Sequence, residues 1–222
     1  MTTVVAYDSR PGSKKDEFYD PLPPTASYVR VVADVKDVAS AVLAVLPPAG
    51  SAVAVTKHLC GGASDSSLLS LLSLPLSERI GAVLLAPCCH QKTRRGEYSN
   101  LPYLRSLGFC ESHVGVRGRA QDSDWTAMLK LISMSKNTKK SNLESFEYSK
   151  SPILKLLGFA RCRALGRMAR RVLEEGRRRR LVEGGFGDAR VVEYVNEGVT
   201  GDNLAIVGTK SRGAEICGEC ES

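Results

Sequence analysis

Apolar runs alternate with segments of helical periodicity along this chain, and the alternation predicts a sheet flanked by helices. The runs that read as buried strands are 4–8, 28–34, 51–59 and 80–86. Apolar residues recur at helical spacing in five other segments, namely 37–46, 66–74, 101–107, 124–133 and 161–182. Strands that alternate with helices imply parallel βαβ units, so an α/β fold is expected.

The end of the chain has a different pattern. Two runs at 189–195 and 203–210 are joined by a turn containing Gly and Asn, which predicts an antiparallel pair. A parallel sheet closed by such a pair is typical of the Rossmann-like class I methyltransferase variant of the doubly wound fold. We expect one domain over 1–222, with a polar insertion loop at 134–152 and a flexible tail at 211–222.

Composition limits the function classes. The 222 residues have a net charge of +7 and a pI of about 9.1, which favours an anionic partner, first of all a nucleic acid. No apolar run reaches the roughly 20 residues that span a bilayer, and the N-terminus lacks a signal-peptide pattern. We therefore expect a cytoplasmic or nuclear protein with reduced cysteines, no membrane association and no obligatory protein partner.

Reactive side chains follow two of the predicted strands. The string Lys-His-Leu-Cys-Gly-Gly-Ala-Ser-Asp occupies 57–65, and Pro-Cys-Cys-His occupies 87–90. In open α/β sheets, ligands bind beyond the carboxyl ends of the strands. Asp65 is also predicted to cap the helix that follows it. These two strings are therefore the first candidates for a functional site.

The cysteines allow several interpretations. Cys88 and Cys89 are adjacent and do not form a CxxC pair, so no metal site is predicted. A protein that uses these residues for thiol chemistry or zinc binding is a weaker alternative function. A nucleophilic thiol would need a base beside it to lower its pKa. Small, close packing around a ligand is the favoured role for Cys60, Cys88 and Cys89. Cys217 and Cys220 form a true CxxC on the polar tail.

The helix predicted at 161–182 combines an apolar face with a dense set of arginines. Its apolar face is expected to consist of Leu165, Met168, Ala169, Val172 and Leu173. The arginines expected to contact RNA phosphates are Arg167, Arg170, Arg171, Arg177, Arg178, Arg179 and Arg180. The alternative is an ordinary charged face exposed to solvent. The four consecutive arginines at 177–180 argue against it, because such faces usually carry charges of both signs.

Three strings together resemble one family. The string at 57–65, the Cys-Cys-His at 88–90 and the arginine helix from 165 to 177 are similar to those of eukaryotic tRNA 2′-O-methyltransferases that modify the fourth nucleotide of the acceptor stem. The strings occur in the family's order and the resemblance covers nearly the whole chain. It implies S-adenosylmethionine as cofactor, tRNA as partner and methylation of a ribose 2′-hydroxyl in the acceptor stem.

The resemblance also implies roles for individual residues. His58 or Lys57 would orient or deprotonate the hydroxyl, with Asp65 second and His90 as a further candidate. The alternative is that His58 or His90 is a core histidine whose hydrogen bonds are satisfied within the protein. Asp8 and Asp34 match the acidic strand ends that face the cofactor ribose and adenine. The full set of implied cofactor contacts is Asp8, Asp34, Cys60, Gly61, Cys88 and Cys89.

The chain departs from the family pattern in three places. Gln91 stands where the family usually has a second His, and Ser64 where it usually has Thr. The family's first strand and glycine-rich turn have no counterpart ahead of residue 4, so an N-terminally incomplete domain is expected. A non-catalytic tRNA- or RNA-binding remnant of the family is therefore the alternative function.

Overall fold

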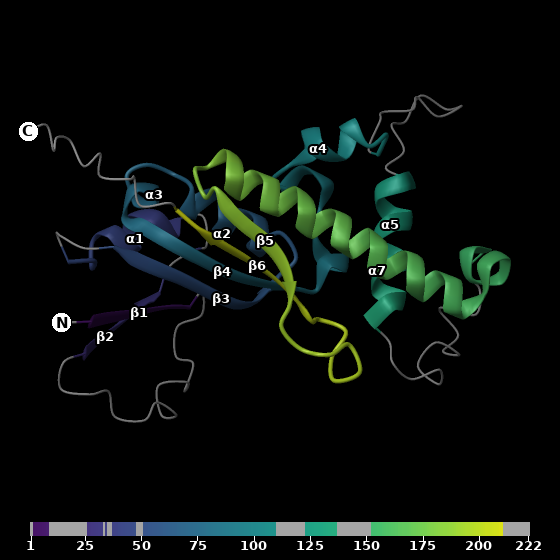
Figure 1. The fold of residues 1–222 in the computed structure, drawn as a ribbon, viewed down its shortest axis with the longest axis horizontal. Coiled ribbons are helices and arrows are strands. Elements are labelled where there is room, and N and C mark those ends of the chain that lie inside the picture. Colours follow the sequence, from purple (N-terminus) through teal and green to yellow (C-terminus); the bar gives the residue numbers. More distant parts are fainter. Residues whose placement is uncertain are drawn as a thin grey trace, which may run out of the picture.

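The computed structural model describes residues 2–8, 26–32, 34, 37–47, 51–109, 123–136 and 152–210, and it confirms a mixed α/β protein (Figure 1). The strands are β1 (Thr2–Asp8), β2 (Ala26–Val32), β3 (Ala52–Cys60), β4 (Ile80–Cys88), β5 (Asp188–Glu193) and β6 (Leu204–Thr209). The helices are α1 (Val38–Leu43), α2 (Ala63–Leu71), α3 (Leu76–Arg79), α4 (Leu101–Ser106), α5 (Ser123–Lys136) and α7 (Pro152–Glu183). Two short 3₁₀ turns, η3 (His90–Lys92) and η4 (Arg95–Glu97), follow β4.

The strands form two sheets. β1 and β2 pair in parallel as a two-stranded sheet, and the other four strands form a mixed sheet in the order β3-β4-β6-β5. β3 and β4 are parallel, whereas β6 runs antiparallel to both β4 and β5. The predicted antiparallel pair at the end of the chain is therefore confirmed.

One face of the four-stranded sheet holds the main core. Val83 and Leu85 of β4 and Ile206 of β6 are almost fully buried there, against Leu68 of α2 and Leu181 of α7. Because strand side chains alternate between faces, these residues at every second position all point to the helices. The helices α2, α3 and α7 therefore lie on this face (Figure 1).

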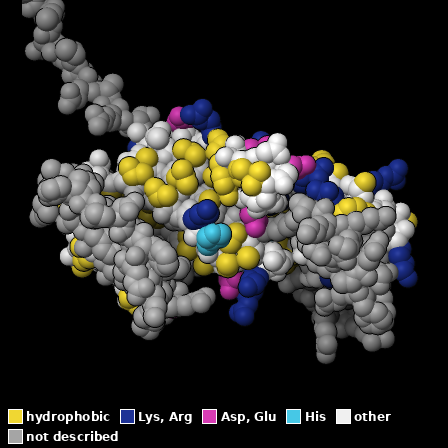
Figure 2. All heavy atoms as spheres, turned by 90° about the horizontal axis from the view of Figure 1, so that it is seen from below, with side chains coloured by type: hydrophobic (Ala, Val, Ile, Leu, Met, Phe, Trp, Pro, Cys, Tyr) yellow, Lys and Arg dark blue, Asp and Glu magenta, His cyan; other side chains and the backbone are white. Residues whose placement is uncertain are grey.

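The opposite face of β3 and β4 is open. Val53 and Val55 are 67% and 68% exposed, and Leu84, paired with Val55, is also exposed. Figure 2 shows hydrophobic side chains gathered on the surface of the molecule. This half of the sheet thus presents an apolar face to solvent, while its other face is packed.

A second core lies between α4, α5 and α7, away from the sheet. Tyr98, Leu104, Trp125, Ile132 and Leu173 are buried together in it. Tyr98 and Trp125 make a tilted ring contact with centroids 5.8 Å apart. The long helix α7 therefore joins the two cores, with its second half on the sheet and its middle against α5.

The element boundaries differ from the predicted ones in informative ways. α7 begins at Pro152, nine residues earlier than predicted, although Gly158 interrupts it with a non-helical φ of 72°. α5 extends to Lys136, into the predicted 134–152 loop, and the rest of that loop up to Ser151 and the predicted tail lie outside the described residues. None of the described helices has the length and apolar character needed to cross a bilayer.

Gly166 allows α7 to approach α5 closely. A Cβ on Gly166 would lie 2.0 Å from the Leu131 backbone oxygen, a contact that backbone movement alone could relieve. We expect Gly166→Ala to destabilise the protein by about 1–3 kcal/mol, although Ala in a helix is intrinsically favoured by about 1 kcal/mol. Urea unfolding would measure this. Ala160→Gly, on an exposed position of the same helix, is the control, and an unchanged or raised stability for Gly166→Ala would contradict this packing.

Candidate functional site

The carboxyl end of β3 is irregular at His58. The β3–β4 register shifts between Lys57 and Leu59, where Lys57 pairs with Ala86 and Leu59 with Pro87. Proline has no N–H to donate to the ladder, and this accounts for a break at that point. His58 has a φ of 62°, a conformation that non-glycine residues rarely adopt. Bulges of this kind redirect side chains, and Lys57 and His58 are both exposed here.

Three thiols lie beside this bulge. The Sγ atoms of Cys60, Cys88 and Cys89 are all within 4.8 Å of one another, and those of Cys60 and Cys88 are 3.5 Å apart. Burial and the neighbouring thiols raise the pKa of Cys88 to about 12. Cys89 also has a positive φ, at 46°. The two predicted strings thus do meet at one edge of the sheet.

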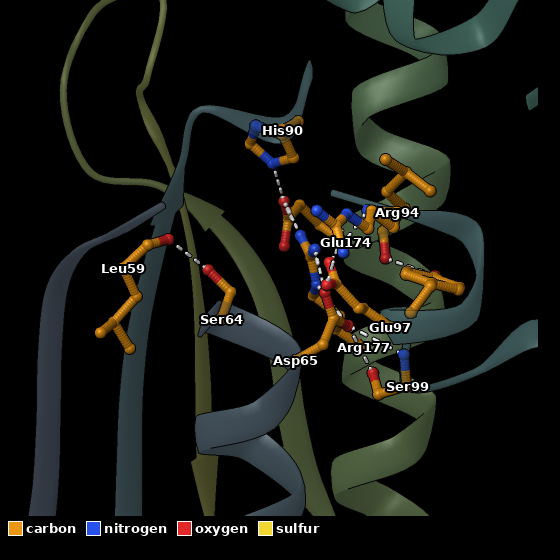
Figure 3. Close-up of polar contacts among 11 residues, drawn as sticks. Leu59, Ser64, Asp65, His90, Arg94, Glu97, Ser99, Glu174 and Arg177 are labelled. Carbon is orange, nitrogen blue, oxygen red and sulfur yellow. Dashed lines mark hydrogen bonds and ion pairs between the residues drawn. The ribbon is translucent and has the colours of Figure 1, made fainter. Parts of the chain in front are cut away.

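Asp65 is fully buried and bound on all sides. Its Oδ1 accepts hydrogen bonds from the backbone N and the Oγ of Ser99, at 3.0 and 2.8 Å. Arg177 donates from Nε to Oδ1 at 3.1 Å and from Nη2 to Oδ2 at 2.6 Å. Figure 3 shows this bidentate contact between α2 and α7. Asp65 therefore holds two helices together.

The same arginine reaches a second carboxylate. Arg177 Nη1 donates to Glu174 Oε1 at 2.9 Å, and that oxygen also contacts Nε2 of His90 (Figure 3). Glu174 is completely buried and His90 and Arg177 are each 1% exposed. A buried chain of ionisable groups therefore runs from His90 through Glu174 and Arg177 to Asp65.

Charge pairing controls the ionisation of this chain. Burial on its own raises the pKa of Glu174, but Arg177, His90 and Arg170 outweigh it and hold that pKa below its usual range. Burial lowers the pKa of Arg177, and Asp65 and Glu174 more than reverse that effect. Tyr98, whose ring lies 5.6 Å from the Arg177 guanidinium, has a pKa raised by burial. Glu174 and Arg177 are therefore charged at neutral pH.

These contacts correct two expectations about single residues. Asp65 does not cap α2, because the N-cap is Gly62 and Asp65 lies within the first turn. Asp65 and His90 are also enclosed, so neither faces solvent where a substrate hydroxyl would bind. Gly61 is packed rather than open, since a Cβ there would lie 2.9 Å from the Lys92 backbone.

The acidic strand ends lie on the other sheet. Asp8 ends β1 opposite Val32, and its side chain lies outside the described residues. Asp34 follows β2 and is exposed. The structure therefore brings together the candidates on β3 and β4 but does not join them in one sheet with the acidic strand ends.

The buried face of α7 is not the predicted apolar one. Leu165 and Met168 are 39% and 65% exposed, while Arg170 and Arg177 are 4% and 1% exposed. The buried residues recur at helical spacing and are Cys162, Gly166, Arg170, Leu173, Glu174, Gly176, Arg177 and Leu181. Arg170 donates to Asn203 at 2.5 Å, so Arg170 and Arg177 are both occupied inside the protein. The expectation that these two contact phosphates is therefore wrong in this structure.

The arginine run at 177–180 is balanced by carboxylates. Besides the Arg177 contacts, Arg178 and Arg179 both donate to Glu175, and Arg180 pairs with Glu183 at 3.0 Å. These acidic residues belong to the same helix, one turn away, so their side chains face the arginines. The net charge around residues 177–180 is thus far less positive than four consecutive arginines suggest.

The middle of α7, from Arg163 to Arg171, lines a cavity of about 250 Å³. Its wall includes four arginines and is completed by the β5–β6 connection; the basic residues are Arg163, Arg167, Arg170 and Arg171. Two exposed ion pairs cross it, from Arg167 to Glu197 at 3.5 Å and from Arg171 to Glu193 at 3.1 Å. Four guanidinium groups against two carboxylates leave this cavity positive.

Sequence reasoning missed Glu174, Ser99 and Tyr98 as parts of the site. Glu174 links His90 to Arg177, Ser99 binds Asp65, and Tyr98 donates to the Leu173 carbonyl at 2.8 Å. One signal was available: Arg170, Glu174 and Arg177 share a helical face with two glycines at 166 and 176, which indicates close packing.

Comparison with known proteins gives a consistent picture. The family described as Methyltransferase TRM13 matches residues 7–209. A protein of Eremothecium gossypii named tRNA:m(4)X modification enzyme TRM13 is 29% identical over 184 residues, 83% of this chain and 39% of that protein. Its namesake in Kluyveromyces lactis is 31% identical over 165 residues, 74% of this chain and 37% of that protein. No solved structure matches the chain.

The chain spans well under half the length of these two relatives. The family match nevertheless covers both candidate strings, the arginine helix and the final strand pair. The chain therefore belongs to the TRM13 methyltransferase family.

Proposed function

We propose that this protein transfers a methyl group from S-adenosylmethionine to a ribose 2′-hydroxyl in the acceptor stem of tRNA. The observation that carries the proposal is the family match over 7–209, combined with two exposed basic side chains at a strained strand end. The relatives are named as tRNA modification enzymes, which supports tRNA as the substrate here.

The strand order supports a class I methyltransferase fold. The parallel β3–β4 pair followed by the antiparallel β6 and β5 corresponds to the closing half of that sheet. We assign the parallel β1–β2 pair, which ends at Asp8 and precedes Asp34, to the cofactor side of such a sheet. Ligands in such sheets bind at the carboxyl ends of the strands, where these residues lie.

The residues fit the cofactor on its adenine side. Asp34 is exposed just beyond β2, so its carboxylate can accept hydrogen bonds from cofactor hydroxyl or amino groups. S-adenosylmethionine would supply an electrophilic methyl group on a sulfonium. The cluster of Cys60, Cys88 and Cys89 would pack near it, while Lys57 and His58 would orient the hydroxyl and accept its proton.

Two measurements test the proposal together. Calorimetric titration with S-adenosylhomocysteine should show one site per chain, and methyl transfer to tRNA should label the acceptor stem at a ribose. Alkaline hydrolysis locates such a methyl group, because a 2′-O-methylated nucleotide resists cleavage. A folded chain that binds tRNA but neither binds S-adenosylhomocysteine nor transfers a methyl group would contradict the proposal.

That outcome would favour the alternative, a non-catalytic RNA-binding protein. The separation of Asp8 and Asp34 from Lys57 and His58 into two sheets is the observation in its favour. Both functions need an RNA-binding surface, so a test of that surface applies to either.

We propose that the positive cavity on the middle of α7 contacts the RNA backbone. The double variant Arg163→Gln/Arg167→Gln should weaken tRNA binding and lower the slope of log K against log salt by about 0.7–0.9 for each phosphate that is no longer neutralised. Fluorescence anisotropy at several salt concentrations would measure both. Arg179→Gln/Arg180→Gln removes the same charge from the balanced half of α7. An equal weakening in that control would place RNA binding on the run at 177–180 instead.

A further inference from the structure

The three thiols at the ends of β3 and β4 form a cluster in which every potential ligand atom is a cysteine sulfur. Cys60 comes from β3, Cys88 from the end of β4, and Cys89 from the residue after it. All three Sγ atoms lie within 4.8 Å of one another, and no imidazole or carboxylate among the described residues joins the cluster. The cysteines are free thiols in this structure.

The spacing suits a tetrahedral ion. With Zn–S bonds of about 2.3 Å, the sulfur atoms of a tetrahedral site lie about 3.8 Å apart. Cys60 and Cys88 are already 3.5 Å apart, and the third sulfur is within 4.8 Å of both, so side-chain rotations suffice. An all-thiolate donor set selects soft or borderline ions over Mg²⁺ and Ca²⁺.

The backbone holds the cluster in place. Cys89 has φ 46° and ψ 40°, a left-handed conformation that costs a non-glycine residue energy and turns its side chain back toward the strand end. Gly61, directly after Cys60, also has a positive φ and is packed on the Lys92 backbone. Cys88 is buried and Cys60 is exposed, so the cluster opens to solvent on the Cys60 side.

We propose that Cys60, Cys88 and Cys89 bind one Zn²⁺ ion, with water at the fourth position on the exposed side. Each thiol that coordinates the ion releases its proton to solvent, so the bond is formed to a thiolate. The site does not depend on the proposed function, since a chain without methyl transfer would still present the three sulfurs. In the sequence, the adjacency of Cys88 and Cys89 argues against a metal site. In the structure, Cys60 of β3 supplies a third thiol beside them.

The test is a Co²⁺ titration of the reduced, metal-free full chain, followed by competition with Zn²⁺. One Co²⁺ per chain should bind, with the visible bands of tetrahedral cobalt and a thiolate charge-transfer band, and one Zn²⁺ should displace it. Cys60→Ser should weaken Zn²⁺ affinity at least about 100-fold, because losing even an outer-shell partner costs 10–100-fold. Cys60 is exposed, so this variant keeps the fold.

Two controls separate this site from other cysteines. Cys217→Ser/Cys220→Ser removes the CxxC near the C-terminus and should leave the titration unchanged, as should Cys162→Ala, which is buried between α5 and α7. Absence of stoichiometric Co²⁺ binding would overturn the proposal. So would binding that survives Cys60→Ser and Cys89→Ser but disappears in the CxxC variant.

Discussion

Arg177→Met is expected to lower the free energy of unfolding by about 3–5 kcal/mol, because it leaves two carboxylates buried without their partner. Arg177 is 1% exposed and makes ion pairs with Asp65 at 2.6 Å and Glu174 at 2.9 Å. Methionine fills a similar volume, so the loss of stability reports charge rather than a cavity. Urea unfolding at neutral pH, followed by circular dichroism, measures it.

Arg179→Met is the matched control. Arg179 is on the same helix and pairs with Glu175 at 3.0 Å, but its side chain is 53% exposed. Exposed pairs contribute under about 1 kcal/mol, so the two variants should differ several-fold in their effect. If Arg177→Met and Arg179→Met lowered the free energy of unfolding equally, the burial of Arg177 in the structure would be contradicted.

The partner substitution Asp65→Asn tests the role of Asp65. If Asp65 joins α2 to α7, Asp65→Asn should also destabilise the protein, and the double variant Asp65→Asn/Arg177→Met should be destabilised by less than the sum of the two. A catalytic Asp65 predicts a different result, in which methyl transfer falls while stability is kept. The buried geometry favours the first result.

The strands were predictable because each is a short apolar run with turn residues around it. β3 and β4 agree with prediction to within two residues at each end, and the antiparallel pairing of β5 and β6 follows from the Gly- and Asn-containing turn. Helix ends were less predictable. α2 begins at Ala63, ahead of Asp65, because Asp65 is used for tertiary contacts with Ser99 and Arg177 instead of capping.

The buried face of α7 could not be predicted from apolar spacing alone. Leu165 and Met168 look like core residues but are exposed, whereas Glu174 and Arg177 look like surface residues and are buried. Burial of a charge is favourable only when a partner is in place, and the partners of Arg177 include Asp65, 112 positions earlier in the chain. A pattern read within one helix contains no information about such a partner.

The candidate site was predictable in place but not in detail. The sequence located Lys57, His58 and the thiols at two strand ends, and the structure brings these ends together in one parallel pair. The strained φ of His58 depends on the pairing of Leu59 with Pro87 across the two strands. The register between strands is a tertiary feature, so neither string alone indicates it.

His58→Asn is expected to lower kcat for methyl transfer by about 10²–10⁴-fold, the usual contribution of a general base, with KM for tRNA changed far less. Asparagine tolerates the positive φ at this position better than most residues, so the backbone is kept while the imidazole is removed. The proposed reaction needs the hydroxyl proton to leave as the oxygen–carbon bond forms, and an imidazole nitrogen of His58 can accept it. Single-turnover kinetics on acceptor-stem tRNA measure the effect.

Lys57→Met, with Lys130→Met on the exposed surface of α5 as its control, separates the two basic groups. If His58 takes the proton and Lys57 only orients the ribose or its phosphate, kcat falls by the general-base factor in His58→Asn and by much less in Lys57→Met. The reverse pattern would assign the proton to Lys57. Full activity in both variants would exclude Lys57 and His58 as the groups that accept the hydroxyl proton.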